Sequence, residues 1–385
     1  MHILIVASWY KNAENPIAGS FIEEQARMLQ RRGHMVAVLH AYINGTFRDM
    51  LSGRKELFTE ENDKGIVTMR LATNVYVPKI RQLSYSRLCH KALKCVRNYI
   101  RSNGKIEVIH SHAMFMGGVV ANYISRKLNI PYFHTEHTSG FIFRLEQYTS
   151  SDIQLAKKVY EQSRQSFFVS HFAKDRIAKL CGVKEKKYSV LHNVVSPLFF
   201  KEYDCPKFEC FTFLAIGNFI PRKNFDTIIE AWSSYVRNQQ SDRLIIVGDG
   251  PLKSEMENLI KTLNLTDSVE MLPRQSREAT ARLMHQSHVV LSASSIETFG
   301  MTLAEALASG IPVISTNSGG VTDIVNSSNG ILLDSITAKA IERGMSEMRE
   351  KYSFFKPVEL RNYANERFSE EAIYKQLIGE YERIR

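Results

Sequence analysis

Short apolar runs rich in β-branched residues alternate with amphipathic helical patterns, and this alternation constrains the fold more than any other feature. It is typical of βα units whose strands pair into a parallel sheet. Predicted strands cover residues 2–7, 35–40, 108–111, 132–135, 166–169, 188–191, 212–217, 244–248, 269–272, 289–292, 312–315 and 330–333. Predicted helices include residues 21–32, 224–237, 252–263, 301–308 and 336–350. The sequence therefore predicts an α/β protein with Rossmann-like, doubly wound parallel sheets.

The pattern occurs twice, which indicates two domains. A chain of 385 residues is longer than one hydrophobic core usually serves, and each half holds about one Rossmann-sized sheet. The periodicity lapses over residues 196–210, so we expect the linker there. Residues 1–195 then form the first domain and residues 196–368 the second. After a second lapse near Lys356 and Pro357, a last helix at about 369–385 is expected to cross back to the first domain.

Composition is that of a globular protein in a reducing compartment. Hydrophobic residues make up 44% and charged residues 23%. The five cysteines have no CxxC spacing, which suggests neither a zinc site nor a disulfide framework. The chain start is predicted to be a strand rather than a signal peptide, and no run approaches the roughly 18 apolar residues that span a bilayer. We therefore expect a cytoplasmic protein, with peripheral association at the inner face of the cell membrane as an option.

Positive charge is concentrated in the first half. Residues 1–195 carry 29 Lys and Arg against 15 Asp and Glu, whereas the rest carries 21 against 25. Residues 64–106 hold ten basic residues and no acidic one, and residues 85–101 within them form an amphipathic helical pattern. We expect the apolar stripe to pack on the first sheet and the basic side to attract an anionic membrane, at about 1 kcal/mol per basic residue. Nucleic acid is not expected, because no nucleic-acid module is recognisable.

The turn after the first strand is the first candidate site. It lacks a G-x-G-x-x-G fingerprint, which removes the main support for a dehydrogenase. Gly19 stands where a helix opens, and a glycine there lets backbone amides approach a phosphate at the helix N-terminus. The alternative is a plain helix-entry turn with Ser20 as the N-cap. The motif alone favours neither.

Two carboxylates flank a predicted strand-to-helix turn in the second half. Glu297 and Glu305 have seven residues between them, and Gly300 lies where the helix begins. Such a turn offers free amides to a phosphate at the carboxyl edge of a sheet. Nothing suggests the separation of about 5 Å that a retaining glycosidase needs. The alternative is that Glu297 only caps the helix and Glu305 lies on a solvated face.

Basic residues follow the first predicted strand of the second half. Gly217 and Asn218 come at its end, and Arg222 and Lys223 precede the next helix. Both long side chains can donate to phosphate oxygens, Arg222 with bidentate geometry. A basic helix start opposes the helix dipole, which favours a compensating anion over two solvated side chains.

An ordered set of short motifs resembles glycosyltransferase family 4, of the GT-B fold, from residue 16 to about residue 334. In chain order the motifs are Gly19-Ser20-Phe21 with Gln25, Gly33-His34, Ile109-His110-Ser111-His112, Thr135-Glu136-His137, Val190-Leu191-His192-Asn193, Gly217 with Lys223, Gly248-Asp249-Gly250-Pro251, Glu297 with Glu305, Ser318-Gly319-Gly320 and Asn329-Gly330. Each motif is weak alone, whereas the ordered set is specific. The resemblance implies two Rossmann-like domains that face an interdomain cleft.

The resemblance also implies roles for single residues. Glu297 would contact the sugar hydroxyls of a nucleotide-sugar donor, Glu305 the ribose, and His137 the sugar and the reacting phosphate. The diphosphate would be held by Lys223 and by backbone amides near Gly19 and over Thr298, Phe299, Gly300 and Met301. His137 and Glu297 are thus the candidate catalytic residues. The family retains anomeric configuration and needs no metal or other cofactor. It commonly has Arg at the position of Asn218, and Arg222 is the candidate that supplies this charge.

The predicted function is transfer of a hexose-type sugar from a UDP- or GDP-linked donor to a lipid-linked or polysaccharide acceptor in cell-surface glycan synthesis. Two alternatives stay open: an epimerase or hydrolase of nucleotide sugars on the same fold, and a non-catalytic sugar-nucleotide sensor. His110, His112 and His134 are expected to pack or to form hydrogen bonds rather than to bind a metal, because no third ligand has an obvious spacing.

Overall fold

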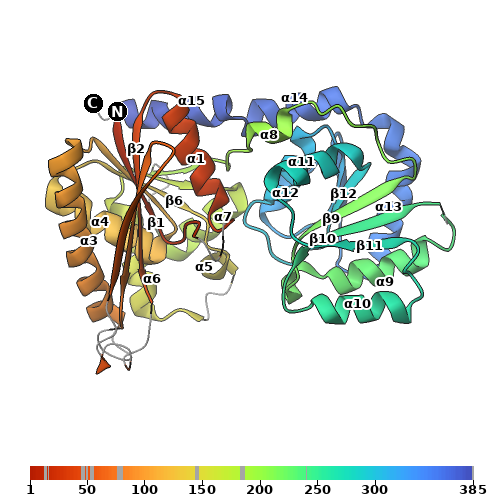
Figure 1. The fold of residues 1–385 in the computed structure, drawn as a ribbon, viewed down its shortest axis with the longest axis horizontal. Helices are drawn as coiled ribbons and strands as arrows, with labels where there is room; N and C mark the ends of the chain where they lie inside the picture. Colours follow the sequence, from red (N-terminus) through yellow and green to blue (C-terminus); the bar gives the residue numbers. More distant parts are fainter. Residues whose placement is uncertain are drawn as a thin grey trace. The chain divides into compact units, whose positions relative to one another are not determined.

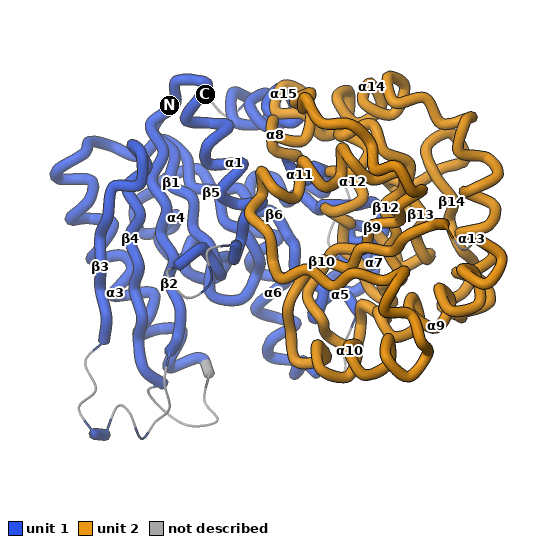
Figure 2. Tube along the Cα trace, turned by 45° about the vertical axis from the view of Figure 1, so that its right-hand side comes forward, with its two compact units in different colours: residues 1–194, 373–385 blue, residues 195–372 orange. Residues whose placement is uncertain are grey.

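The computed structural model describes residues 1–12, 15, 17–44, 48, 51–52, 56–75, 81–143, 147–182, 187–239 and 241–383. Pro16, where the motifs of the resemblance begin, lies outside these residues. The chain divides into two compact units, drawn in blue and orange in Figure 2. Unit 1 holds Met1–Val194 together with Ile373–Arg385, and unit 2 holds Val195–Ala372.

Unit 1 is built on an eight-stranded sheet in the order β3-β4-β2-β1-β5-β6-β7-β8. Its strands are β1 (His2–Ala7), β2 (Met35–Ile43), β3 (Leu57–Asp63), β4 (Ile66–Thr73), β5 (Val108–His112), β6 (Tyr132–Glu136), β7 (Gln165–Phe168) and β8 (Tyr188–Val190). Neighbouring strands are parallel except for β3, which runs antiparallel to β4. The strand order reverses between β1 and β5, and in open α/β sheets ligands bind at the carboxyl edge beside such a reversal.

Helices cover both faces of the unit 1 sheet (Figure 1). One face is covered by α3 (Arg81–Asn103), α4 (Val119–Leu128), α6 (Ser150–Gln162) and α7 (His171–Cys181), and the short α5 (Ser139–Phe143) follows β6. The other face is covered by α1 (Ser20–Arg31) and α15 (Glu370–Glu382). From α15, Ile373 and Leu377 are fully buried in a cluster with Ile3 and Ile5 of β1. The C-terminal segment is therefore part of the unit 1 core.

The apolar stripe predicted for the basic helix packs on the unit 1 sheet. Leu88, Ala92, Val96 and Tyr99 of α3 are buried in the same cluster as Leu4 of β1. This confirms the predicted orientation of the stripe, whose remaining member, Cys95, is half-buried.

Unit 2 is built on a six-stranded parallel sheet in the order β11-β10-β9-β12-β13-β14. Its strands are β9 (Thr212–Asn218), β10 (Arg243–Asp249), β11 (Val269–Leu272), β12 (Val289–Ser292), β13 (Val313–Thr316) and β14 (Gly330–Leu333). Its helices are α8 (Pro197–Phe200), α9 (Phe225–Tyr235), α10 (Lys253–Thr262), α11 (Arg277–Gln286), α12 (Met301–Ala308), α13 (Ala338–Lys351) and α14 (Pro357–Phe368). The strand order is that of the doubly wound dinucleotide-binding fold and reverses between β9 and β12.

The twelve predicted strands and the predicted helices are present, with ends that move by a few residues. The prediction was wrong at three places. It missed β3 and β4, because β3 is exposed along its length and has no apolar alternation. Residues 196–210 include the short helix α8, and α14 begins at Pro357, where a lapse was expected. Proline is tolerated at the first helical position, so Pro357 starts a helix instead of marking a loop.

Candidate active site

In unit 2 the sequence motifs meet where the sheet order reverses. Asn218 ends β9, Lys223 lies in a short 3₁₀ turn directly after it, and Glu297 lies in the loop after the neighbouring strand β12. The carboxyl ends of parallel strands meet at one edge of the sheet. The topology thus brings Lys223 and Glu297, 74 positions apart in the sequence, to the same edge.

Lys223 and Glu297 form a direct ion pair. The ammonium Nζ of Lys223 donates to Oε1 of Glu297, and the two side chains remain 19% and 16% exposed. Burial raises the pKa of Glu297, but the charge and hydrogen bond of Lys223 outweigh it and hold the pKa below its ordinary value. Glu297 is therefore an anion that is accessible in part, beside a cation of matching length.

The backbone of Glu297 is fixed by the Ser318-Gly319-Gly320 loop. Its N–H donates to Ser318 O at 2.8 Å, and its carbonyl accepts from Gly320 N at 2.9 Å. A Cβ at Gly320 would lie 2.0 Å from Thr298 O, so only glycine permits this approach. The loop thereby sets the height at which Glu297 leaves the sheet edge.

Helix α12 begins at Gly300, beside this carboxylate. Gly300 is the N-cap with a left-handed φ of 107°, and no side chain caps the helix. The alternative that Glu297 caps the helix is therefore wrong. Uncapped N-termini are suited to anions because amides and dipole point the same way. Thr298 and Met301 are half-buried, and Phe299 is buried with its ring 5.6 Å from that of Phe368.

Glu305 is buried rather than solvated, at 8% exposure. Nη2 of Arg277, the first residue of α11, lies 3.3 Å from Glu305 Oε1, and the guanidinium stands 5.4 Å from the ring centre of Phe199. The predicted alternative of a solvated face is wrong, because the first turns of α12 pack into the unit. Arg277 carries no motif signal, and its partner lies 28 residues away, so the sequence did not indicate this pair.

Asn218 also has an arginine partner, although a different one from the residue expected. Arg274, in the loop after β11, donates from Nη2 to Asn218 Oδ1 at 3.2 Å. Arg222 instead reaches Ile296 O at 3.4 Å, in the loop that leads to Glu297. Two cations therefore lie along this edge, one in contact with Asn218 and one in contact with the Glu297 loop.

In unit 1 the corresponding edge carries Gly19 and His137. Gly19 is the left-handed N-cap of α1, and again no side chain caps the helix, so the alternative of Ser20 as N-cap is wrong. Phe21, in the first turn of α1, places its ring centre 4.4 Å from that of His137, which follows β6. The helix start and the histidine are thus neighbours within unit 1.

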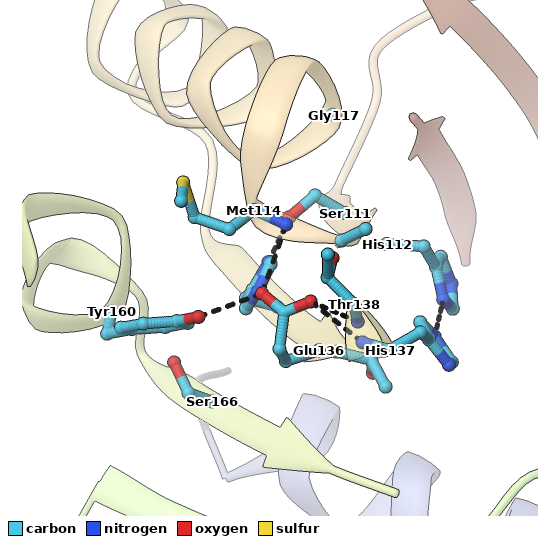
Figure 3. Close-up of polar contacts among 12 residues, drawn as sticks. Ser111, His112, Met114, Gly117, Glu136, His137, Thr138, Tyr160 and Ser166 are labelled. Atoms are coloured by element: carbon cyan, nitrogen blue, oxygen red, sulfur yellow. Dashed lines mark hydrogen bonds and ion pairs between the residues drawn. The ribbon is translucent and has the colours of Figure 1, made fainter. Parts of the chain in front are cut away.

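His137 is held by a second buried histidine. Its Nε2 lies 2.9 Å from Nδ1 of His112, the last residue of β5, and both rings are stacked 5.2 Å apart (Figure 3). Gln25 Nε2 of α1 lies 3.5 Å from His112 Nε2. An amide nitrogen only donates, so in this arrangement His112 carries its proton on Nδ1 and donates to His137 Nε2. The proton of His137 is then on Nδ1, which has no hydrogen-bond partner among the described residues.

These imidazoles are held neutral. Burial lowers the pKa of His137 to about 3 and that of His112 well below its ordinary value. A neutral Nδ1–H is a hydrogen-bond donor that adds no positive charge. The unit 1 edge therefore offers a fixed, uncharged donor at His137.

The other histidines serve structure, as predicted. His110 bonds Thr135 Oγ1 at 2.7 Å and the hydroxyl of Tyr381 in α15, and His134 Nδ1 lies 2.8 Å from Ser111 Oγ. Within the described residues, no three His, Cys, Asp or Glu side chains gather so that they could hold a metal ion. None of the helices in the described segments combines the length and the apolar character that a membrane crossing requires.

Two family models together span most of the chain. "Glycosyltransferase Family 4" matches residues 18–197, and "Glycosyl transferases group 1" matches residues 208–367. The first covers the unit that carries Gly19 and His137, and the second covers the unit that carries Lys223, Glu297 and Glu305. The chain therefore belongs to the family 4 glycosyltransferases.

Proteins of similar sequence carry the names of glycosyltransferases. A protein of Methanocaldococcus jannaschii described as an uncharacterized glycosyltransferase is 29% identical over 261 residues, 67% of this chain and 69% of that protein. A phosphatidylinositol N-acetylglucosaminyltransferase of Arabidopsis thaliana is 24% identical over 93% of this chain and 76% of its own length. Alpha-monoglucosyldiacylglycerol synthase of Streptococcus pneumoniae is 25% identical over 61% of this chain, which spans 56% of that protein.

Solved structures show that the two sheets form the GT-B fold. HepE of Anabaena, in complex with UDP, matches with a TM-score of 0.74 and 17% identity over 98% of this chain and 99% of its own. Sucrose-phosphate synthase of Thermosynechococcus elongatus matches with a TM-score of 0.75 and 16% identity over 100% and 99%. At these identities the likeness concerns the fold alone.

Proposed function

We propose that this glycosyltransferase moves a hexose-type sugar from a nucleotide-diphosphate donor to a lipid-linked or polysaccharide acceptor in cell-surface glycan synthesis, with retention of anomeric configuration and without a bound metal. The observation that carries the proposal is the unit 2 edge. There the Lys223–Glu297 pair stands directly before the uncapped N-terminus of α12. A diphosphate needs cations and amides, and a sugar needs a hydroxyl acceptor beside them.

Each unit 2 residue has a proposed role that follows from its contacts. Lys223 and the amides from Thr298 to Met301 bind the diphosphate and stabilise the charge that develops on it as the glycosidic bond breaks. Glu297, whose other oxygen is not paired with Lys223, accepts from the sugar hydroxyls. Glu305, held by Arg277, accepts from the ribose hydroxyls. Asn218, Arg222 and Arg274 add polar and cationic groups along the same edge.

In unit 1, Gly19 and His137 are the proposed contributors. The Nδ1–H of His137 donates to the donor sugar or to the reacting phosphate and positions it. Amides at the start of α1 add to the diphosphate contacts. A neutral imidazole suits this role, because it cannot withdraw the proton that the attacking acceptor hydroxyl passes to a phosphate oxygen.

Comparisons support the substrate classes. HepE, which shares the fold, is described in complex with UDP and with UDP-glucose. The relatives in Arabidopsis and Streptococcus pneumoniae are named for glycosylation of phosphatidylinositol and of diacylglycerol. The exposed basic side chains of α3, such as Lys94, Arg97 and Arg101, would bind the anionic inner face of the cell membrane, where lipid-linked acceptors are found.

Donor screening tests the proposal. UDP-, GDP- and ADP-sugars are added in the presence of a chelator, and the melting temperature is recorded, since a ligand of the folded state raises it by mass action. We expect one base to stabilise the protein, and sugar transfer to require an acceptor. Product formed without an acceptor would favour the epimerase or hydrolase, and binding without turnover would favour the sensor. Anomeric proton signals of the product then report retention or inversion.

A further inference from the structure

Glu136 is a fully buried carboxylate at the end of β6, next to His137. Its side chain is 0% exposed, and no lysine or arginine pairs with it in the part of the chain that the structure describes. A lone buried carboxylate is unstable unless hydrogen-bond donors surround it. The contacts of Glu136 therefore decide what its charge does in the fold.

Five donors surround this carboxylate (Figure 3). Oε1 accepts from the backbone N–H groups of His137 at 2.9 Å and Thr138 at 2.7 Å. Oε2 accepts from Met114 N at 3.1 Å, from the hydroxyl of Tyr160 at 2.8 Å and from His134 Nε2 at 3.3 Å. Burial raises the pKa of Glu136, but the bonds from His134 and Thr138 outweigh it and lower the pKa to about 2. The carboxylate is thus ionised at neutral pH.

Three of the five donors are backbone amides of two turns that carry the histidine pair. Met114 lies two residues after His112, and the amide of His137 itself is bonded. The first turn is under tension, because Ala113 and Met116 both have a left-handed φ of 62° without being glycine. Such a turn keeps its shape only where surrounding contacts hold it. Glu136 joins this turn to the one that bears His137.

We propose that Glu136 is a positioning residue, whose carboxylate clamps the turns after β5 and β6 so that the imidazole of His137 stands at a fixed place and angle. The inference rests on the proposed function of His137. Glu136 itself touches no substrate. It acts through the peptide of His137 and, by way of Met114, through the strand end that carries His112.

Glu136→Gln is the sharpest test, because it keeps size and shape. The amide oxygen of the new side chain can still accept from His137 and Thr138, but an NH₂ group then faces the N–H of Met114, donor against donor. We expect kcat to fall about 10- to 100-fold, as for a catalytic group moved by about an ångström, while KM for the donor changes less than about threefold.

A spectroscopic measurement needs no substrate. Nitrogen-15 spectra of the histidine side chains, assigned with His137→Gln, report the tautomer and surroundings of the His137 ring. In the wild type we expect a neutral ring with its proton on Nδ1, and in Glu136→Gln a shifted or broadened signal. An unchanged His137 signal together with unchanged kcat would overturn the proposal.

Two control variants separate positioning from general stabilisation. Asp152→Asn removes another buried carboxylate of unit 1 that bonds a backbone amide, Thr149 N at 3.0 Å, in the capping box of α6. We expect it to lower the melting temperature without a change in kcat or in the His137 signal. Tyr160→Phe removes one donor to Glu136 but none of the three amides, so the His137 signal should stay. A His137 signal that shifts equally in all three variants would contradict the clamp.

The two readouts, turnover and the ring signal, also separate this inference from the proposed function. If the wild type turns over none of the tested donors, the proposed function fails, while the ring signal still decides whether Glu136 positions His137. If Glu136→Gln does not fold, Glu136→Asp takes its place, since it keeps the charge and draws the oxygens away from the amides. A normal His137 signal and normal kcat in Glu136→Asp would then sink the proposal.

Discussion

The two units carry half-sites of opposite chemical character. In unit 2 the candidate residues are ions in pairs, Lys223 with Glu297 and Arg277 with Glu305, and each side chain remains 11% to 28% exposed. In unit 1 the candidate His137 and its partner His112 are buried, and burial keeps both rings neutral. One half-site offers charge, and the other offers position.

This difference shows how a single fold can divide a reaction. Partly exposed ion pairs exchange partners at small cost, so Lys223 can turn from Glu297 to a phosphate when a ligand arrives. Buried neutral groups cannot change partners without loss, because an unpaired polar atom in the interior is costly. We therefore expect ligand charge to be sensed by unit 2, and geometry to be held by unit 1.

The largest effects should come from the two candidate catalytic residues. His137→Ala and Glu297→Ala should each lower kcat by about 10²- to 10⁴-fold, because a positioned donor or acceptor is lost where charge develops. Circular dichroism should remain that of the folded protein. His90→Ala, on the exposed face of α3, and Glu257→Ala, in an exposed pair with Lys253, are the matched controls. Near-normal turnover in both site variants would break the comparison.

Loss of the unit 2 cation should weaken donor binding next most. Lys223→Ala removes a charged donor to phosphate, so we expect a loss of about 1.5–3 kcal/mol, or roughly 10- to 150-fold in Kd by titration calorimetry. Lys253→Ala removes a lysine from a surface pair with Glu257 and should leave Kd unchanged. Equal effects of the two variants would show that general charge, not the Lys223 position, attracts the donor.

Acid should destabilise unit 1 more than unit 2. Among the described residues, the pKa is lowered for His2, His40, His110, His112 and His137 in unit 1, and for His285 and His288 in unit 2. Below pH 6.5 the unfolded chain takes up protons that these native rings refuse, so stability falls as pH falls. Each ring contributes at most about 1.4 kcal/mol per pH unit.

The two tryptophans allow this to be measured for each unit. Trp9 lies in unit 1 and Trp232 in unit 2, so Trp232→Phe and Trp9→Phe leave one reporter each. Denaturant midpoints followed by fluorescence at pH 7 and pH 5 should drop further for the Trp9 reporter. An equal or larger drop for the Trp232 reporter would contradict the contrast in buried histidines.

The smallest effects are expected at the unit 2 arginines. Arg222→Ala and Arg274→Ala should each raise the Kd of the donor about 3- to 10-fold, because both side chains are accessible and screened by solvent. The ratio decides which of them takes the place of the arginine that family 4 commonly has at Asn218. Unchanged donor affinity in Arg222→Ala would remove it from the site.

Local pattern predicted most of the fold, and long-range pairing accounts for what it missed. The buried strands stand out because their apolar runs are continuous, whereas β3 is exposed along its whole length and carries no such signal. The order of strands, the clamp at Glu136 and the Arg277–Glu305 pair depend on residues brought together by packing. Glu136 lies in a motif that the sequence marks, but its donors Met114 and Tyr160 are 22 and 24 residues away.

Titration calorimetry of nucleoside diphosphates in the presence of a chelator tests the central claim most directly. That claim is that Lys223, Glu297 and the start of α12 form a diphosphate site that needs no metal. We expect UDP, GDP or ADP to bind the wild-type chain with one-to-one stoichiometry and with the same Kd whether EDTA or Mg²⁺ is present. Absence of binding by all three, or binding that disappears on chelation, would contradict the account.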